Sequence, residues 1–155
     1  MLMVDSKAPD FNLNGLDAEG KESLYSLKDI IHPGKKTVLY FYPKDDTPGC
    51  TKEACDFRDN FNRLTSKAVV VGVSADSIAS HEKFREKQGI NFILLSDPSH
   101  EMLINYGVWQ KKSMMGKSYM GIVRTTFIID ENGIINKIWD SVDVKGHVDD
   151  VLNSI

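Results

Sequence analysis

Two short apolar runs separated by an amphipathic segment constrain the fold of this chain most strongly. The runs KTVLYFY (residues 36–42) and AVVVGVSAD (residues 68–76) are rich in β-branched and aromatic residues, as is typical of strands buried on both faces. Residues 50–66 between them carry apolar side chains at helical spacing. These side chains are Ala54, Phe57, Phe61 and Leu64. The unit therefore predicts a strand, a helix and a parallel strand joined by a right-handed crossover.

The same alternation of elements continues on both sides of this unit. We expect an N-terminal β-hairpin within residues 9–27, a helix over 77–89, a strand over 91–97, a helix over 99–107, a loop over 108–124, a second hairpin within 125–139 and a closing helix over 146–155. Together these elements predict an α/β sandwich with a central mixed sheet flanked by helices. We expect one domain spanning residues 1–155, because no linker or repeat interrupts the pattern.

Composition excludes several classes of function. The chain has 155 residues, is 41% hydrophobic and carries a formal net charge of -3, with lysines and arginines scattered rather than clustered. Nucleic acid is therefore not an expected partner. No run approaches the roughly 18 apolar residues of a membrane span, and the N-terminus lacks an export leader, so we expect a cytoplasmic protein without membrane contact. Two cysteines are too few for a disulfide scaffold, which agrees with a reducing compartment.

The placement of the two cysteines is the main functional signal. Both lie in YPKDDTPGCTKEAC, which follows the apolar residues 37–41. Pro48 suits the first position of a helix and Thr47 the N-cap before it, so Cys50 falls in the first helical turn. Unpaired backbone N–H groups and the positive end of the helix dipole favour a thiolate there. The alternative is that Cys50 is a small buried hydrophobe and that Thr47, Pro48 and Gly49 only begin a helix.

Cys55 favours a redox interpretation, because two thiols five residues apart are poorly explained by packing alone. A metal site is the competing use of the thiols. The four histidines are dispersed, however, and none has a ligand spacing relative to the cysteines. They are His32, His81, His100 and His147, which we interpret as surface or helix-face residues. The spacing also differs from Cys-x-x-Cys, the motif of thiol-disulfide exchange catalysts.

A resemblance to a known family rests on these residues. YPKDDTPGCTKEACDFRD together with RTTFIIDENG resembles the peroxiredoxins, specifically the bacterioferritin-comigratory-protein or Q-type branch. Pro43, Thr47 and Cys50 match the Pro-x-x-x-Thr-x-x-Cys signature, Cys55 matches a second cysteine, and Arg124 matches an arginine that opens a later strand. The similarity extends over nearly the whole chain. It implies a thioredoxin-like fold and a thiol-dependent peroxidase that uses no metal, haem or flavin.

The resemblance also implies a role for each matching residue. Cys50 corresponds to the peroxidatic cysteine, which becomes a sulfenic acid, and Cys55 to the resolving cysteine, which converts that acid to a disulfide. Thr47 corresponds to the hydroxyl that hydrogen-bonds the peroxide, and Pro43 shields the thiolate. Backbone N–H groups of Gly49 and Cys50 hold the second peroxide oxygen. The simpler alternatives are an inert helix thiol, an ordinary N-cap and a proline that ends a strand.

Arg124 would place a guanidinium beside the thiolate, whereas the simpler alternative is an exposed strand end. Glu53 lies one turn after Cys50, where an anion facing the sulfur opposes a thiolate, so we expect it to be solvated or turned toward another partner. We expect residues 44–46 to form a hydrated loop. The apolar residues of the segment before Arg124 either wall a pocket for an organic hydroperoxide or pack in the core or loop. These residues are Trp109, Met114, Met115, Tyr119 and Met120.

The resemblance further implies hydrogen peroxide and small organic hydroperoxides as substrates, thioredoxin or a glutaredoxin-like dithiol protein as reductant, and a monomer. A copper-binding thioredoxin-like chaperone and a holdase or non-catalytic redox sensor are the rival functions. Helix geometry adds one prediction. On an intact helix the Cα atoms of Cys50 and Cys55 lie about 8.5 Å apart, beyond the roughly 4.4 to 6.8 Å that a disulfide allows. We therefore expect a helix over residues 50–57 in the reduced protein and its local unwinding on oxidation.

Overall fold

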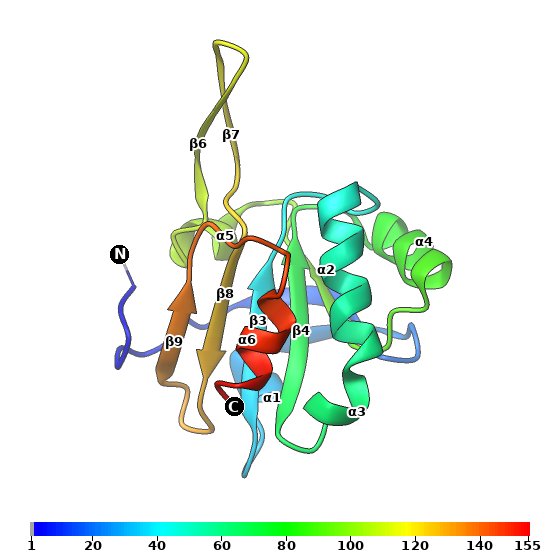
Figure 1. Cartoon of the computed structure of the whole chain (residues 1–155), viewed down its shortest axis with the longest axis vertical. Coiled ribbons are helices and arrows are strands. Elements are labelled where there is room, and N and C mark those ends of the chain that lie inside the picture. Colours follow the sequence, from blue (N-terminus) through cyan, green and yellow to red (C-terminus); the bar gives the residue numbers. More distant parts are fainter. Residues whose placement is uncertain (1) are drawn as a thin grey trace.

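The computed structural model describes residues 2–155 and is built around a seven-stranded mixed sheet (Figure 1). In spatial order the strands are β2 (Glu22–Ser26), β1 (Asn12–Leu16), β5 (Ile93–Ser96), β4 (Ala68–Ser74), β3 (Lys36–Phe41), β8 (Thr125–Ile129) and β9 (Ile135–Trp139). Strands β3, β4 and β5 are parallel, whereas β1 and β8 pair antiparallel with β5 and β3. The predicted mixed sheet, the parallel crossover and both hairpins of the sheet are therefore confirmed.

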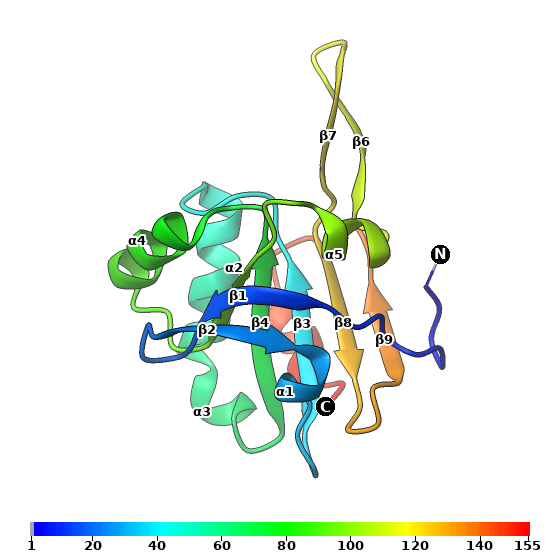
Figure 2. The ribbon, with the colours of Figure 1, turned by 180° about the vertical axis from the view of Figure 1, so that it is seen from behind.

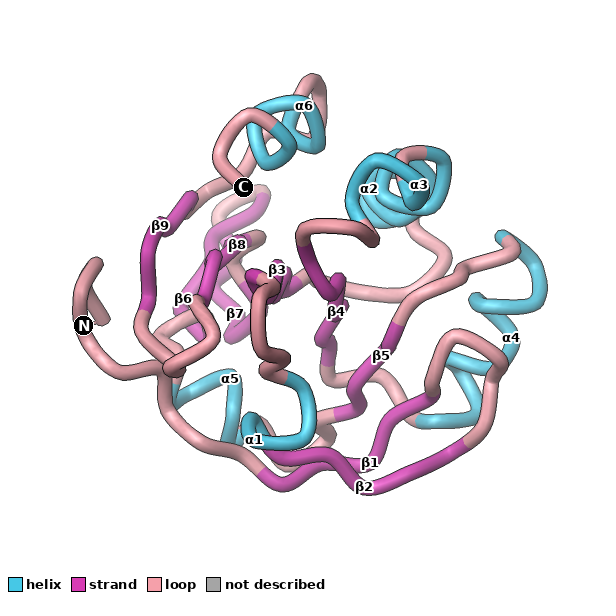
Figure 3. The backbone as a smooth tube through the Cα atoms, turned by 90° about the horizontal axis from the view of Figure 1, so that it is seen from below, coloured by secondary structure: helices cyan, strands magenta, loops and turns pink. Residues whose placement is uncertain are grey.

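Helices cover both faces of this sheet. They are α1 (Leu27–Ile30), α2 (Pro48–Asp59), α3 (Phe61–Leu64), α4 (Ile78–Gln88), α5 (Glu101–Asn105) and α6 (His147–Leu152). Figure 3 shows α2, α3 and α6 on one side of the strand layer and α1 and α5 on the other. The view from behind places the β1–β2 hairpin across the face opposite α2 (Figure 2).

The alternation of side chains along β3 produces two apolar cores. Val38, Tyr40 and Tyr42 pack on the side of α2, α4 and α6, where they meet Ala54, Phe57, Phe84 and Val148. Leu39 and Phe41 point to the other side and pack with residues of α1, α5 and β8. Because successive side chains of a strand point to opposite faces, a continuous apolar run is what a strand covered on both sides needs.

Two predicted elements differ from the structure. The helix begins at Pro48 after the N-cap position Thr47, as expected, but it breaks at Asn60 instead of continuing to residue 66. The side-chain amide of Asn60 donates to the carbonyl of Asp56 at 2.8 Å. The loop expected over residues 108–124 is wrong, because β6 (Trp109–Met114) and β7 (Lys117–Ile122) form an antiparallel hairpin that projects from the body of the protein (Figure 1). Its two-residue turn has positive φ at both Met115 (53°) and Gly116 (80°), a conformation usually signalled by Asn-Gly.

A membrane-crossing helix is not found among residues 2–155, since none of their helices combines sufficient length with sufficient apolar character.

Candidate active site

Cys50 lies where the carboxyl end of β3 gives way to α2. Thr47 precedes the helix with extended backbone (φ -95°, ψ 153°), Pro48 occupies the first helical position and Cys50 the third. The Cys50 side chain packs in the core with 1% exposure. Gly49 and Cys50 belong to the first turn, where backbone N–H groups have no acceptor within the helix. The sulfur therefore lies at the positive end of a twelve-residue helix.

Arg124 reaches the sulfur from another part of the chain. It lies between β7 and β8, and pairing of Thr125 with Phe41 brings it to the end of β3. Its Nη2 donates to Cys50 Sγ at 3.4 Å. A Cβ atom on Gly49 would lie 3.1 Å from that same nitrogen, so the glycine leaves room for the guanidinium. The structure thus brings Arg124, Gly49 and Cys50 together, and the exposed-strand-end alternative for Arg124 is wrong.

Glu53 is the second partner of the guanidinium. Its Oε1 accepts from Arg124 Nη1 at 2.6 Å, and its side chain is completely buried. Burial raises the pKa of Glu53 to about 7, although Arg124 acts in the opposite direction. The expectation that the Glu53 side chain is solvated is wrong. The alternative, that it turns toward another partner, is correct, and this partner is Arg124. The spacing itself held the signal, because Glu53 falls on the same helical stripe as the buried residues Cys50, Ala54 and Phe57.

Thr47 and Pro43 frame the loop that leads into α2, residues 43–47, which we call the entry loop. Both side chains are partly buried. Thr47 occupies the N-cap position but its hydroxyl makes no capping bond and instead donates to the carbonyl of Lys44 at 2.8 Å. The ordinary N-cap interpretation of the Thr47 side chain is therefore wrong, and the hydroxyl oxygen keeps its acceptor capacity beside the helix start.

Cys55 lies on α2 with Cys50, and both thiols are free. Its partly buried Sγ donates to Gln88 Oε1 of α4 at 3.5 Å. Arg58 of α2 bonds the Gln88 carbonyl and so holds the same helix end. The helix predicted over residues 50–57 for the reduced protein is confirmed.

Two of the histidines are buried and lie on helix faces rather than at the surface, the second of the two alternatives that we expected. His81 of α4 is 0% exposed and bonds Asp45 of the entry loop, while His147 of α6 is 3% exposed and its Nε2 lies 2.8 Å from Thr126 Oγ1. Burial lowers the pKa of His147. Asp45 is buried as well, so the expected hydrated loop over residues 44–46 is wrong at that position. No local signal marks the Asp45–His81 pair, because its members are 36 residues apart.

Most of the apolar residues before Arg124 lie outside the core, and Trp109, which packs against it, is the exception. Four of them extend from the β6–β7 hairpin with exposures of 43% to 96%, namely Met114, Met115, Tyr119 and Met120. Trp109 at the base of the hairpin stacks on His100 with ring centroids 3.9 Å apart.

Comparisons with known proteins agree with this geometry. The model of the AhpC/TSA family matches residues 4–138. A putative peroxiredoxin bcp of Coxiella burnetii is 48% identical over 153 residues, which are 98% of this chain and 97% of the relative. The bacterioferritin comigratory protein of Xanthomonas campestris, whose solved structure concerns its alkyl peroxide reduction activity, has 38% identity and a TM-score of 0.80 over 92% of this chain and 88% of that one. A Xylella fastidiosa PrxQ structure gives a TM-score of 0.89 at 32% identity, covering 99% and 95% of the two chains. The expected thioredoxin-like fold is confirmed by this likeness.

Proposed function

Since this chain belongs to the AhpC/TSA family, in the Bcp/PrxQ branch of the peroxiredoxins, and is therefore a thiol peroxidase, we propose that Cys50 is its peroxidatic cysteine and Cys55 its resolving cysteine. The observation that carries the proposal is the 3.4 Å contact between Arg124 Nη2 and Cys50 Sγ at the first turn of α2. Two sources of positive potential, the helix N-terminus and a guanidinium, meet at one sulfur.

In the first step the Cys50 thiolate attacks the terminal oxygen of a hydroperoxide. The O–O bond breaks, the sulfur becomes a sulfenic acid, and an alcohol or water leaves after taking up a proton. Arg124 stabilises the thiolate and the negative charge that develops on the leaving oxygen. The N–H groups of Gly49 and Cys50 and the hydroxyl of Thr47 orient the peroxide, and Pro43 limits water at the sulfur.

Glu53 holds the guanidinium in the orientation that this step needs. A bidentate donor that serves two acceptors keeps a fixed plane, so the bond from Nη1 to Glu53 directs Nη2 at Cys50. The pKa of Glu53, raised by burial to about 7, leaves part of the carboxyl groups neutral near neutral pH, which weakens their competition with the thiolate for Arg124.

In the second step the Cys55 sulfur attacks the sulfenic sulfur, water leaves, and a disulfide forms. An ideal helix separates the two Cα atoms by about 8.5 Å, so α2 must unwind locally before the sulfurs meet. A dithiol protein then reduces the disulfide, and we assign this role to thioredoxin or a glutaredoxin-like protein. Gln88, which accepts the Cys55 hydrogen bond, must release that thiol first.

We assign hydrogen peroxide and small organic hydroperoxides as substrates. The alkyl peroxide reduction activity named for the Xanthomonas campestris protein supports the organic class. A monomer in the cytoplasm, with the whole chain as one domain, completes the proposal. Two unpaired thiols in the reduced chain, which suit a reducing compartment, support the location.

The deciding experiment measures peroxide consumption coupled to thioredoxin, thioredoxin reductase and NADPH. We expect Cys50→Ser to abolish turnover, because a serine hydroxyl is not ionised at neutral pH. Cys55→Ser should undergo the first oxidation but lose cycling, with sulfenic, sulfinic and sulfonic acids at Cys50 in mass spectra. Residual activity of Cys50→Ser near the wild-type level would refute the assignment of Cys50. Normal cycling of Cys55→Ser would remove Cys55 as the resolving thiol.

A further inference from the structure

The entry loop is fastened to the rest of the protein by the buried side chain of Asp45. Asp45 Oδ1 accepts from the hydroxyl of Tyr42 at 2.5 Å. Its Oδ2 accepts from Ser80 Oγ at 2.8 Å and bonds His81 Nδ1 at 2.7 Å. Only 3% of the Asp45 side chain and none of the His81 side chain is exposed. A loop that carries a buried carboxylate with three donors is fixed at that residue.

The two ring nitrogens of His81 both face acceptors. Nδ1 lies against the Asp45 carboxylate and Nε2 lies 2.8 Å from the carbonyl oxygen of Leu95 in β5. An imidazolium, which carries hydrogen on both nitrogens, satisfies both of these acceptors at once. Burial alone lowers the pKa of His81, but the hydrogen bond and the charge of Asp45 outweigh burial and raise it. The pair is therefore a buried ion pair that joins the entry loop, α4 and β5.

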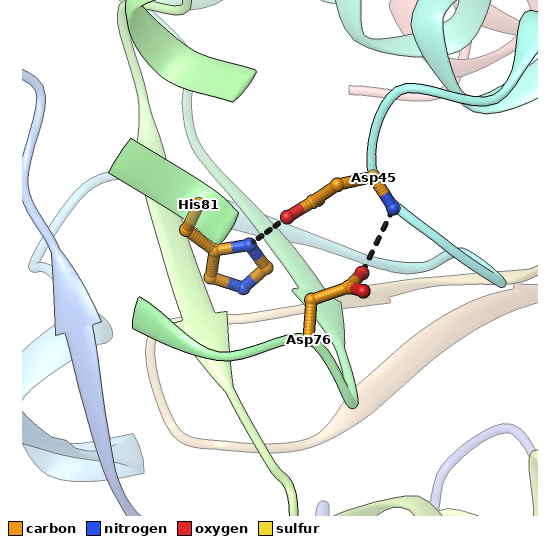
Figure 4. A group of neighbouring side chains, drawn as sticks. All are labelled: Asp45, Asp76 and His81. Carbon is orange, nitrogen blue, oxygen red and sulfur yellow. Dashed lines mark hydrogen bonds and ion pairs between the residues drawn. The ribbon is translucent and has the colours of Figure 1, made fainter. Parts of the chain in front are cut away.

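Asp76 supplies a second attachment for the same residue. Its Oδ2 accepts from the backbone N–H of Asp45 at 2.8 Å (Figure 4). The same oxygen accepts from Ser74 Oγ at 2.6 Å. Ser74 ends β4, so this contact ties the entry loop to the carboxyl edge of the parallel strands. The side chain of Asp45 is thus bonded to Tyr42, Ser80 and His81, whereas its backbone N–H is bonded to Asp76.

A cation site is the other use to which these three residues lend themselves, because their ligand atoms lie within 4.8 Å of one another. The hydrogen bonds argue against it. A histidine that binds a metal through Nδ1 must lose the hydrogen there, and His81 directs that hydrogen at Asp45. Asp76 Oδ2 already accepts two bonds.

We propose that His81 and Asp45 form a positioning pair for the peroxide step, which holds Pro43 and Thr47 in place while α2 remains free to unwind. The inference rests on the proposed function, because it assigns Pro43 and Thr47 to the peroxide site. Among residues 2–155, neither member of the pair forms a hydrogen bond or an ion pair with Cys50. They act through the entry loop, which they hold at Asp45, before the start of α2. The unwinding required for the disulfide begins after the loop, at Pro48 and Gly49.

The pair makes the peroxide step sensitive to alkaline pH. When the pH rises through the raised pKa of His81, the ring loses one hydrogen and one of its two nitrogens faces an oxygen without a donor. The entry loop then loses a fixed contact, and misplacement of Thr47 slows the attack. The other groups facing the pair are Asp76 and Tyr42, and burial holds the pKa of Tyr42 well above its usual range, so its hydroxyl stays a donor.

The test measures the rate constant for oxidation of Cys50 by hydrogen peroxide in a single turnover, across pH, and separately the rate of disulfide formation. The two key variants are His81→Asn, whose amide N–H overlays Nδ1 and keeps the bond to Asp45, and His81→Gln, whose amide reaches Leu95 instead. We expect His81→Gln to be about tenfold slower in the peroxide step and His81→Asn to recover most of the loss. Both should lack the alkaline fall of the wild type, and disulfide formation should keep its rate.

The matched control is Lys87→Gln, which removes a second ion pair between the entry loop and α4. Lys87 bonds Asp46 at 3.0 Å, but both side chains are more than half exposed, so the change should leave the rates within about twofold. A wild-type rate in His81→Gln, or an alkaline fall that persists in both histidine variants, would overturn the proposal. If the histidine variants do not fold, Ser80→Ala removes one of the three donors on Asp45, and an unchanged peroxide step there counts against it.

These outcomes are separable from failure of the proposed function. If Cys50→Ser keeps its peroxidase activity, the assignment of Cys50 is wrong whatever the histidine variants do. If Cys50→Ser is inactive while the His81 variants match wild type, only the positioning pair is wrong.

Discussion

At the scale of single residues, the site depends on how one guanidinium is divided between two acidic groups. Arg124 is 15% exposed in its side chain and lies between Glu53 and Cys50. Burial lowers the pKa of Arg124, but the charges of Glu53 and Cys50 outweigh burial and raise it, so the arginine stays charged. The arrangement keeps a largely buried cation at the sulfur, where its charge is screened less than in water.

Replacement of Arg124 should therefore slow the peroxide step. We expect Arg124→Ala to reduce the single-turnover rate constant by about 10²-fold, as for a lost oxyanion donor. Arg124→Lys should recover only part of the rate, because an ammonium has no planar fork to serve Cys50 and Glu53 together. Stopped-flow kinetics and the ultraviolet absorbance of the thiolate measure both effects. The control is Arg58→Lys, because Arg58 lies on α2 like Cys50 but makes no hydrogen bond to it. An unchanged rate in Arg124→Ala would remove Arg124 from the site.

Glu53 makes the stability of the protein depend on pH. Its pKa is about 7 in the folded protein and 4.5 ordinarily, so between these values the folded chain binds more protons than the unfolded chain. The free energy of unfolding must then fall as pH rises from about 4.5 to 7, by at most about 3 kcal/mol from this residue. In Glu53→Gln this contribution should disappear. Urea unfolding at pH 5 and pH 8 measures it, and equal pH dependence in both proteins would contradict the burial argument.

At the scale of elements, α2 has to be both a rigid scaffold and an unwinding segment. It is anchored on one side by buried Cys50, Ala54 and Phe57, while Pro48 and Gly49 begin it. Gly49 lowers the cost of opening the first turn, because glycine gains more backbone freedom than other residues when a helix unwinds. Cys55, by contrast, lies in the middle of the helix.

The disulfide should therefore melt the start of α2. We expect amide hydrogen exchange in residues 50–57 to be slow in the reduced protein and much faster after oxidation by one equivalent of peroxide. Residues of β3 and β4 should keep their protection and serve as the internal reference. A disulfide that forms with unchanged exchange over residues 50–57 would show that the helix geometry does not limit this step.

The elements also show what the sequence could predict and why. β3, α2 and β4 are predictable because their buried faces require apolar side chains at regular positions. This spacing is visible in the sequence. The β6–β7 hairpin is not predictable in this way, since its exposed strands do not need apolar side chains at regular positions. Its turn also lacks the usual residue, because Met115 occupies a position with positive φ. For the site, local spacing located Cys50, Thr47 and the helix start, and the family resemblance located Arg124. The Asp45–His81 pair depends on tertiary contact alone.

At the scale of the whole molecule, the core between the sheet and α2 depends on a close contact between β3 and β4. Tyr40 lies opposite Gly72 in the register of these strands. A Cβ atom on Gly72 would lie 2.9 Å from Cζ and from the hydroxyl oxygen of Tyr40. The Tyr40 ring in turn stacks on Phe57 of α2 with centroids 4.7 Å apart. Glycine thus lets an aromatic ring fill the space between the sheet and the helix that carries both thiols.

This contact gives a prediction that links the core to the helix. We expect Gly72→Ala to lower the free energy of unfolding by about 1 to 3 kcal/mol, because the added methyl group forces the Tyr40 ring toward Phe57. Tyr40→Phe alone should be neutral or slightly stabilising, since the buried Tyr40 hydroxyl has no hydrogen-bond partner within residues 2–155.

The double variant distinguishes this clash from a general intolerance of β4 to change. Removing the hydroxyl relieves one of the two 2.9 Å contacts but leaves the ring carbon Cζ in place, so Tyr40→Phe should recover only part of the loss caused by Gly72→Ala. Urea unfolding of the four proteins, fitted with a shared m-value, gives the coupling free energy. Strictly additive effects would mean that the two residues do not compete for space. The ring would then not transmit strain from the sheet to α2.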